Sequence, residues 1–331
     1  MLHTRFTDLV GCTVPIQLAP MGAVGTPELV VAVAEAGGMG MTALPTAPAE
    51  VVAAMLDGIG AQTSKPFGFN VLMPFLDVDV VYTAAARCRY VDFYHGPVDA
   101  SLVQRVHDAG ALAGWQVGSA DEARDAAGAG CDLLVVRGIE GGGRMYGRSS
   151  LWPLLEAVLD ATDVPVLAAG GIATGRGVAA ALAAGAAGVR MGTRFVATEE
   201  SGAHPLYKKA ICTAGAGDTV LTDEFRTGWP DEVTSSRVLR DALDAASRRP
   251  DDEPVGTMQM GPMVVDVAKL GVPPPVATSD GDVAAMAMYA GESAALIDRV
   301  EPAAAVVQRV ATQAGQLLAR AVAAGDETPV R

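Results

Sequence analysis

The sequence predicts an α/β protein: a closed (β/α)8 barrel with a post-barrel insertion and C-terminal helices. Short apolar runs alternate with segments of helical spacing through residues 1–197. The runs are almost continuously apolar, which is typical of parallel strands that helices cover on both faces. Eight such units fit the length of one TIM-type barrel.

Eight runs have the length of buried strands: Pro15–Pro20, Met39–Leu44, Phe67–Met73, Tyr90–Gly96, Leu112–Gly118, Asp132–Gly138, Val164–Gly171 and Gly188–Val196. Helical spacing marks the segments Pro27–Ala36, Pro48–Ile59, Ser101–Ala109, Ala120–Ala129, Leu151–Ala161 and Gly177–Ala184. The alternative is an open doubly wound sheet, which normally carries a glycine-rich phosphate loop after its first strand. That position here reads Ala19-Pro20-Met21-Gly22 and has no GxGxxG motif.

Glycines follow the last two predicted strands. Gly170, Gly171 and Gly192 remove side chains where a ligand would approach, and Thr193 adds a hydroxyl. Bare N–H groups at such turns bind phosphate, and barrels of this kind commonly do so after strands 7 and 8. The alternative is that these glycines only allow strand and helix to pack closely.

The composition of the chain argues against several kinds of binding partner. The chain has 331 residues and a net charge of −14. This acidity argues against nucleic-acid and anionic-membrane partners, which need a basic face. Cys12, Cys88, Cys131 and Cys212 lack metal-binding spacing and predict reduced thiols. With no signal-peptide pattern and no apolar run long enough to cross a bilayer, we expect a cytoplasmic protein without a metal site.

The composition shifts after the eighth run. Residues 198–276 are rich in glycine, proline and charge, whereas residues 277–331 regain helical periodicity. We therefore expect a cofactor-binding barrel at 1–197 and an insertion at 198–276 that lies over the strand ends. Helices within 277–331 are expected to pack back on the barrel.

Polar side chains stand at the ends of two strands. Barrel active sites are built at the carboxyl ends of the strands, where the third and fifth runs carry Asn70 and Gln116. An amide both donates and accepts hydrogen bonds, so this pair suits a flat heterocycle with N–H and C=O edges, such as a flavin. The alternative is that the amides satisfy backbone groups of the strands.

Six ordered blocks resemble the nitronate monooxygenase family, formerly called 2-nitropropane dioxygenases, which includes related flavin-dependent enoyl reductases. The blocks are APM (19–21), FGFN (67–70), WQVGS (115–119), GIEGGG (138–143), AAGGIATG (168–175) and MGTRFVATEESGAHPLYKKA (191–210). The likeness extends to TDEF (222–225) and YAGES (289–293). This resemblance implies an FMN-dependent oxidoreductase that acts on a small molecule.

The resemblance also implies which residues contact FMN. Ala19, Pro20 and Met21 would line the ring, while Asn70 and Gln116 would bond its polar edge. Gly170, Gly171, Gly192 and Thr193 would hold the phosphate, and Gly291 and Ser293 of the tail would close over the cofactor. The remaining cofactor contacts would be Gly138, Gly143, Ala169 and Met191.

One position departs from the family pattern. The turn after the sixth strand usually ends in a histidine that acts beside the flavin, and this chain has Arg144 there. A guanidinium stays protonated and cannot act as a base, but it can bind an anion or an oxygen that gains negative charge. Three functions stay open: oxidation of preformed nitronates with O2, reduction of an enone, quinone or enoyl thioester, and flavin binding with little catalysis.

Two other side chains join Arg144 as predicted catalytic residues. His95, at the end of the fourth run, can replace the missing base, with a loop-capping role as the alternative. Tyr146 can donate to a substrate oxygen or pack within a lid. Glu140 is expected to pair with Arg144 or Arg137. Because no dinucleotide fingerprint is present, NAD(P)H would bind only transiently. The sequence leaves open whether the protein forms a homo-oligomer.

Overall fold

The computed structural model describes residues 2–230, 235–261 and 263–326. Eight parallel strands form one sheet in the order β1-β9-β8-β6-β5-β4-β3-β2. Their bounds are β1 (Ile16–Leu18), β2 (Gly40–Thr42), β3 (Phe67–Leu72), β4 (Tyr90–Tyr94), β5 (Leu112–Val117), β6 (Leu133–Arg137), β8 (Val166–Ala169) and β9 (Gly188–Met191). Main-chain hydrogen bonds of 2.9 Å, from Leu18 to Met39 and from Met39 to Ile16, join the two ends of this order. The predicted closed barrel is confirmed, and the open-sheet alternative is wrong.

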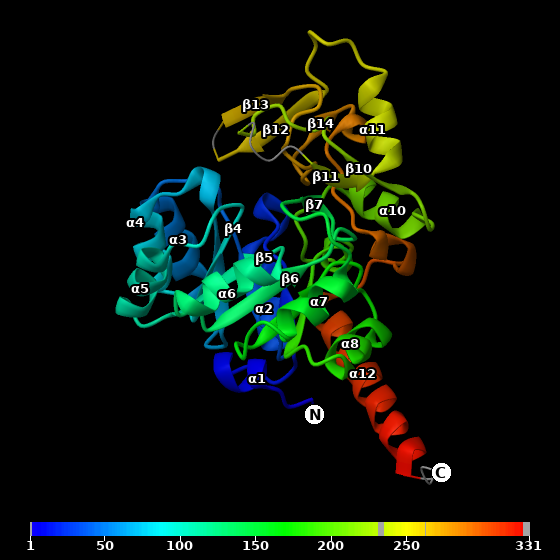
Figure 1. Ribbon diagram of the computed structural model, residues 1–331. Coiled ribbons are helices and arrows are strands. Elements are labelled where there is room, and N and C mark those ends of the chain that lie inside the picture. Colours follow the sequence, from blue (N-terminus) through cyan, green and yellow to red (C-terminus); the bar gives the residue numbers. More distant parts are fainter. Residues whose placement is uncertain (1, 231–234, 262, 327–331) are drawn as a thin grey trace.

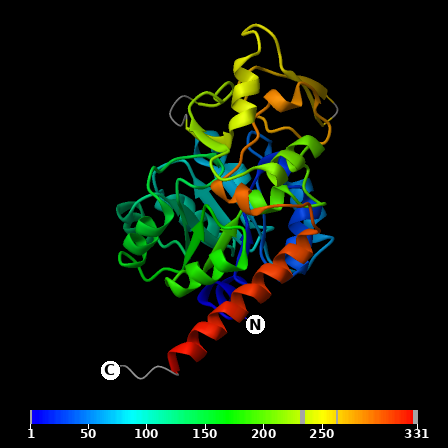
Figure 2. The same cartoon turned by 90° about the vertical axis from the view of Figure 1, so that its right-hand side faces the viewer.

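Helices cover the outside of the barrel: α2 (Pro27–Glu35), α3 (Ala49–Gly60), α4 (Val78–Ala85), α5 (Ala100–Asp108), α6 (Ala120–Gly128), α7 (Leu151–Leu159) and α8 (Gly175–Ala183). The position after β9 is filled by α12 (Ala303–Asp326), which packs against α8 and α2 and extends past the barrel (Figures 1 and 2). A Cβ on Gly175 would lie 2.5 Å from the Gln313 Cβ, so glycine is what lets α12 approach α8.

Local sequence explains where these helices begin and end. Thr26, Asp99 and Ser119 precede α2, α5 and α6, and each side chain accepts a hydrogen bond from a main-chain N–H of the first turn. Gly110 and Gly130 follow α5 and α6 with φ of 89° and 92°, a left-handed conformation that stops a helix.

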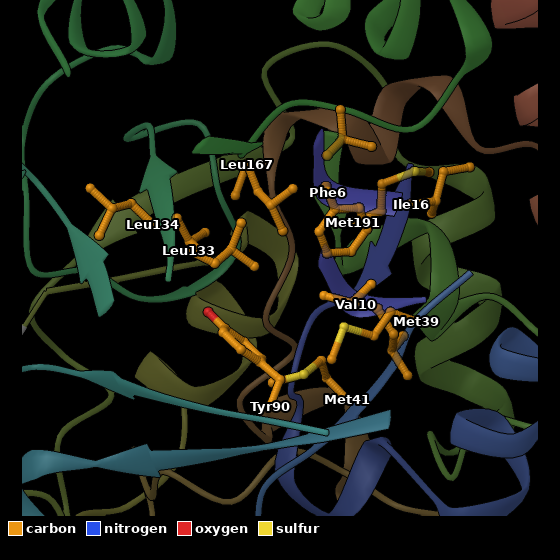
Figure 3. Close-up of a cluster of buried hydrophobic side chains, with 14 of the residues drawn as sticks. Phe6, Val10, Ile16, Met39, Met41, Tyr90, Leu133, Leu134, Leu167 and Met191 are labelled. Carbon is orange, nitrogen blue, oxygen red and sulfur yellow. The ribbon is translucent and has the colours of Figure 1, made fainter. Parts of the chain in front are cut away.

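The barrel interior is apolar near the amino ends of the strands. Figure 3 shows Phe6 and Val10 of α1 (Arg5–Val10) gathered with Ile16, Met39 and Tyr90, all of them buried. Each such side chain contributes about 1.5–3 kcal/mol through burial. This end of the barrel is therefore closed by packing, and room for a ligand must be sought at the opposite end.

A second lobe, built from residues 198–302, stands over the carboxyl ends of the strands (Figures 1 and 2). One of its sheets joins β10 (Thr219–Thr222), β11 (Ser236–Leu239) and β7 (Gly143–Arg144), and the other joins β13 (Met263–Val267), β12 (Gly256–Met260) and β14 (Asp280–Gly281). Helices α10 (Pro205–Thr213) and α11 (Arg240–Ser247) share a separate core with Phe225 and Val238. The division into domains at residues 197 and 276 stays a prediction.

Three sequence expectations concern the chain as a whole. No helix among the described residues is long and apolar enough to cross a membrane. All four cysteines are free, and burial raises the pKa of the Cys12 and Cys131 thiols to about 12. Across the same described ranges, no group of three or more His, Cys, Asp or Glu residues is placed to hold a metal ion.

Candidate active site

The opening formed by the carboxyl ends of the eight strands, here called the mouth, contains a buried polar network. Asp92 of β4 and Arg190 of β9 form an ion pair, and their side chains are 0% and 3% exposed. Arg190 Nε also donates to Gln17 Oε1 at 2.6 Å. Because β4 and β9 lie on opposite sides of the barrel in the strand order, this pair crosses the barrel interior.

The two predicted amides belong to this network. Asn70 Nδ2 donates to Asp92 Oδ1 at 2.9 Å, and Gln116 Oε1 accepts from Arg190 Nη1 at 3.4 Å. Gln116 Nε2 is buried and has no hydrogen-bond partner within the described residues. An unsatisfied buried donor costs about 1–3 kcal/mol. A ligand that brings an acceptor to this nitrogen would recover that free energy.

Glycines line the ends of β8 and β9, and Gly170, Gly171 and Gly192 are here called the glycine rim. Gly170 and Gly171 have φ of 103° and 71°, which residues with a side chain rarely adopt. A Cβ on Gly170 would lie 3.0 Å from the Gly138 carbonyl oxygen, and one on Gly192 would lie 3.3 Å from the Ala19 Cβ. Close packing of neighbouring strand ends therefore explains part of this glycine pattern.

The tail motif YAGES reaches the glycine rim. Gly291 N–H donates to Thr193 Oγ1 at 3.0 Å, and Ser293 is buried. A Cβ on Gly291 would lie 2.7 Å from the Glu140 carbonyl oxygen, so the tail packs directly on the turn after β6. The Thr193 hydroxyl accepts from the tail, which leaves its own O–H to donate to a ligand.

Most remaining predicted contacts lie at the same end of the barrel. Ala19 N–H donates to the Met191 carbonyl oxygen at 2.8 Å, and Gly138 N–H donates to that of Ala169 at 3.0 Å. The Met21 sulfur would lie 3.9 Å from a Cβ on Gly192. The other predicted cofactor contacts are Pro20, which is half-buried, and Gly143, which lies in β7.

Arg144 is buried beneath the second lobe. Its Nη2 donates to the Phe225 carbonyl oxygen, and the guanidinium carbon lies 4.7 Å from the centre of the Trp229 ring. Burial lowers the pKa of Arg144, and the charge and hydrogen bond of Tyr289 oppose that shift. The guanidinium stays charged near neutral pH. It is thus a fixed positive group at the edge of the mouth.

His95 has the left-handed φ of 66° directly after β4. Its ring centre lies 3.7 Å from that of Tyr94 and 5.8 Å from that of Trp229. Nδ1 is buried and has no partner among the residues the structure describes. Burial, followed by the charges of Arg137 and Arg144, lowers the pKa of His95 well below its usual value. The imidazole is therefore neutral at physiological pH.

Tyr146 is the exposed member of the predicted catalytic group. It is 42% exposed, and its ring centre lies 6.1 Å from that of His95. Burial of its inner part raises the pKa of Tyr146, so the hydroxyl stays protonated at neutral pH. The turn behind it is held by Arg137, which donates to the Arg144 carbonyl oxygen at 2.5 Å and to the Tyr94 hydroxyl at 3.2 Å.

The expected ion pair of Glu140 with Arg144 or Arg137 is wrong. Both Glu140 carboxylate oxygens accept from Leu151 N–H at 3.1 Å, at the start of α7. A carboxylate is favourable there because the first N–H groups of a helix lack internal partners and carry partial positive charge. Glu140 is thus a helix cap.

Sequence reasoning missed three residues of the mouth: Asp92, Arg190 and Trp229. The first two are single charges inside the apolar runs YVDFY and GVRM, and that contrast was the available signal, because a buried charge must be paired. Trp229 reaches His95 and Arg144 only through the packing of the second lobe. No local sequence signal marks it.

The fold is an α/β barrel whose mouth has an unsatisfied amide and glycine-lined strand ends under a second lobe. These features are typical of enzymes that bind a small ligand at the barrel mouth. Within that class, the family model described as nitronate monooxygenase matches residues 3–79 and 75–313. The chain belongs to the nitronate monooxygenase family, and it is an oxidoreductase.

Two named relatives and one solved structure are similar to this chain. A (3aS,4S,5R,7aS)-5-hydroxy-7a-methyl-1-oxo-octahydro-1H-indene-4-carboxyl-CoA dehydrogenase of Mycobacterium tuberculosis is 38% identical over 75% of this chain and 70% of its own length. Nitronate monooxygenase npaC of Metarhizium robertsii is 31% identical over 92% of both chains. The structure of FabK from Thermotoga maritima matches with a TM-score of 0.80 and 30% identity, over 98% of this chain and 99% of that one.

Proposed function

We propose that the chain is an FMN-dependent oxidoreductase that oxidises preformed nitronates with O2. The observation that carries this proposal is the charge state of the mouth, which combines a buried cation with neutral hydrogen-bonding side chains. Three carboxylates near the strand ends are already engaged: Asp92 pairs with Arg190, Glu140 caps α7, and Glu122 accepts from Gly118 N–H at 2.8 Å. None of the three is placed to remove a proton from a carbon acid.

The residues at the mouth fit FMN. The unpartnered Gln116 Nε2 would donate to an acceptor on the ring, and Asn70 lies in the same network. The glycine rim would offer main-chain N–H groups to the phosphate, with Thr193 adding a hydroxyl. When bound, FMN would supply electron transfer with the substrate and the reaction with O2. Ala19, Pro20 and Met21 would line the ring in the same proposal.

A nitronate suits this site because it arrives as an anion. Arg144 would bind its oxygens through charge-assisted hydrogen bonds. His95 is neutral and, with its lowered pKa, a weak base, so it would orient the substrate rather than deprotonate it. We therefore expect turnover of nitronates and poor turnover of neutral nitroalkanes.

The second candidate is NAD(P)H-dependent reduction of an enoyl thioester. The observation that favours it is the relative named a carboxyl-CoA dehydrogenase, which is 38% identical to this chain. Arg144 would polarise the thioester carbonyl, and the protonated Tyr146 hydroxyl would donate a proton to the α-carbon of the thioester as the β-carbon accepts hydride. NAD(P)H would bind transiently.

Anaerobic reduction separates the two candidates. Loss of flavin absorbance on addition of ethyl nitronate, with none on addition of NAD(P)H, supports nitronate oxidation. Rapid loss with NAD(P)H, followed by reoxidation on addition of an enoyl thioester, supports the second function. A preparation that is colourless and takes up no FMN contradicts both.

Replacing Arg144 by histidine tests the missing base. Arg144→His restores a group that can take a proton, so we expect the rate with neutral nitroethane to rise about 100-fold. Arg144→Gln is the matched control, because it also loses the charge and the stacking on Trp229. If both variants hold FMN and neither gains activity, Arg144 does not occupy the position of the base.

A further inference from the structure

The ion pair between Asp92 and Arg190 lies where a barrel normally places apolar side chains. Both side chains are almost completely buried, so the pair is costly to desolvate. Replacing such a pair by well-packed apolar residues is often neutral or stabilising. A gain in stability therefore does not explain why these two buried charges are present. Their effect on the neighbouring amide side chains does.

Each charge orients one amide. A carboxylate only accepts hydrogen bonds, so Asp92 requires the Asn70 side chain to turn its nitrogen inward, as the 2.9 Å bond to Oδ1 records. A guanidinium only donates, so Arg190 requires the Gln116 side chain to turn its oxygen inward, at 3.4 Å. The atoms left for a ligand are therefore an acceptor, Asn70 Oδ1, and a donor, Gln116 Nε2.

We propose that Asp92 and Arg190 are positioning residues that set this acceptor–donor pair, and that the pair selects the N–H/C=O edge of the flavin pyrimidine ring. Asn70 Oδ1 accepts from the ring N3–H, and Gln116 Nε2 donates to a carbonyl beside it. Without the two charges, either amide is free to flip and present the wrong atom. The inference rests on the proposed binding of FMN, and it adds the reason why the two amides bind the pyrimidine edge of the flavin in one orientation.

The first test needs no variant. The purified protein is stripped of flavin and titrated with FMN and with 3-methyl-FMN, which lacks the N3 donor, and binding is followed by quenching of flavin fluorescence. We expect FMN to bind at least about tenfold more tightly, because the methyl analogue leaves Asn70 Oδ1 without a donor. Equal affinities overturn the inference. Failure to bind either flavin overturns the proposed function instead.

The second test distinguishes a role of Asp92 in orienting Asn70 from a purely structural role. Asp92→Asn keeps the side-chain volume, but the new amide must turn its oxygen to the Arg190 guanidinium and its nitrogen to Asn70. Asn70 then turns its nitrogen to the ligand, so the preference for FMN over 3-methyl-FMN should fall severalfold relative to the unaltered protein. A purely structural role would weaken both flavins equally and leave that ratio unchanged. An unchanged ratio in Asp92→Asn therefore overturns the role of Asp92.

Gln116→Glu keeps the test decisive if Asp92→Asn does not fold. The new carboxylate still pairs with Arg190 but presents an acceptor in place of the donor, so FMN affinity should fall at least about tenfold. Gln62→Glu, on an exposed segment, is the matched control and should leave FMN affinity unchanged. Unaltered FMN binding by Gln116→Glu overturns the inference.

Discussion

The two halves of the mouth are held in place by different parts of the chain. The inner half consists of Asn70, Asp92, Gln116 and Arg190, which all come from barrel strands and bond to one another. In the outer half, Arg144 is held by groups of the second lobe, the Phe225 carbonyl and the Trp229 ring. The inner half is therefore as rigid as the barrel, whereas the outer half depends on where the lobe sits.

This difference is what we expect if the inner half binds a cofactor and the outer half binds a substrate. A cofactor is the same in every turnover and is best read by groups locked in a rigid scaffold. Substrates differ among relatives, and residues supplied by loops and inserted segments change without disturbing the barrel. The relatives of this chain include proteins named as a CoA dehydrogenase and as a nitronate monooxygenase, which are names of different reactions.

The largest effect should come from breaking the inner half. Arg190→Met removes one partner of a buried pair and leaves the Asp92 carboxylate uncompensated, so we expect a loss of about 3–5 kcal/mol in the free energy of unfolding by urea. Arg124→Met is the control, since its pairing with Asp121 is exposed and is worth under about 1 kcal/mol. Similar losses in both variants would show that the inner half is not specially locked.

A smaller effect should come from the glycine rim. Gly170→Ala forces a side chain into a left-handed residue, at about 1–2 kcal/mol, and places its Cβ 3.0 Å from the Gly138 carbonyl oxygen. We also expect a loss of FMN affinity, measured by fluorescence titration. Gly217→Ala, with φ of 88° and no atom within 4 Å of the added Cβ, carries the backbone strain alone. Equal FMN affinity in the two variants would exclude Gly170 from the phosphate site.

His95, which follows β4 and contacts Trp229 of the outer half, should make the stability of the fold depend on pH. Its pKa is lowered in the folded state, so the unfolded chain binds the extra proton as the pH falls through about 6.5. Stability should then fall with the pH below that value, by up to about 1.4 kcal/mol per unit.

His95→Asn should flatten this dependence in urea unfolding curves between pH 5 and 8 (roughly the range of histidine titration), because asparagine tolerates the left-handed φ but does not titrate there. His3→Asn, in an exposed segment, is the control and should leave the dependence in place. Parallel curves for His95→Asn and the unaltered protein would count against a buried neutral imidazole.

The smallest effect on stability should come from Tyr146→Phe. Its hydroxyl lies on a side chain that is 42% exposed, so we expect a change within about 0.5 kcal/mol. If the outer half carries out thioester reduction, the rate of that reaction should fall at least about tenfold, because a positioned proton donor is lost. Tyr82→Phe, also 42% exposed, is the control. Unchanged reduction would remove Tyr146 from the proton-donating role.

The barrel strands and two of the four inner residues, Asn70 and Gln116, were predictable from the sequence, because strands and their ends follow from local pattern. The buried pair of Asp92 and Arg190 was missed. Each predicted run contains the observed strand, as Tyr90–Gly96 contains β4, and Asn70 and Gln116 stand in those runs. In the outer half the sequence pointed to Arg144 but not to the residues that hold it. Trp229 and Phe225 reach Arg144 through tertiary packing, and β7 pairs with β11 across a long stretch of chain. Local patterns carry no signal for such contacts.

The pairing of β7 with β11 has one more consequence. Arg144 lies opposite Ser236 in that ladder, so the turn that ends the sixth barrel unit is also an edge strand of the covering sheet. If the cover lifts, either this ladder breaks or the guanidinium travels with it. Under the proposed function, opening the cover to admit a substrate would therefore also displace the Arg144 guanidinium that is proposed to bind it.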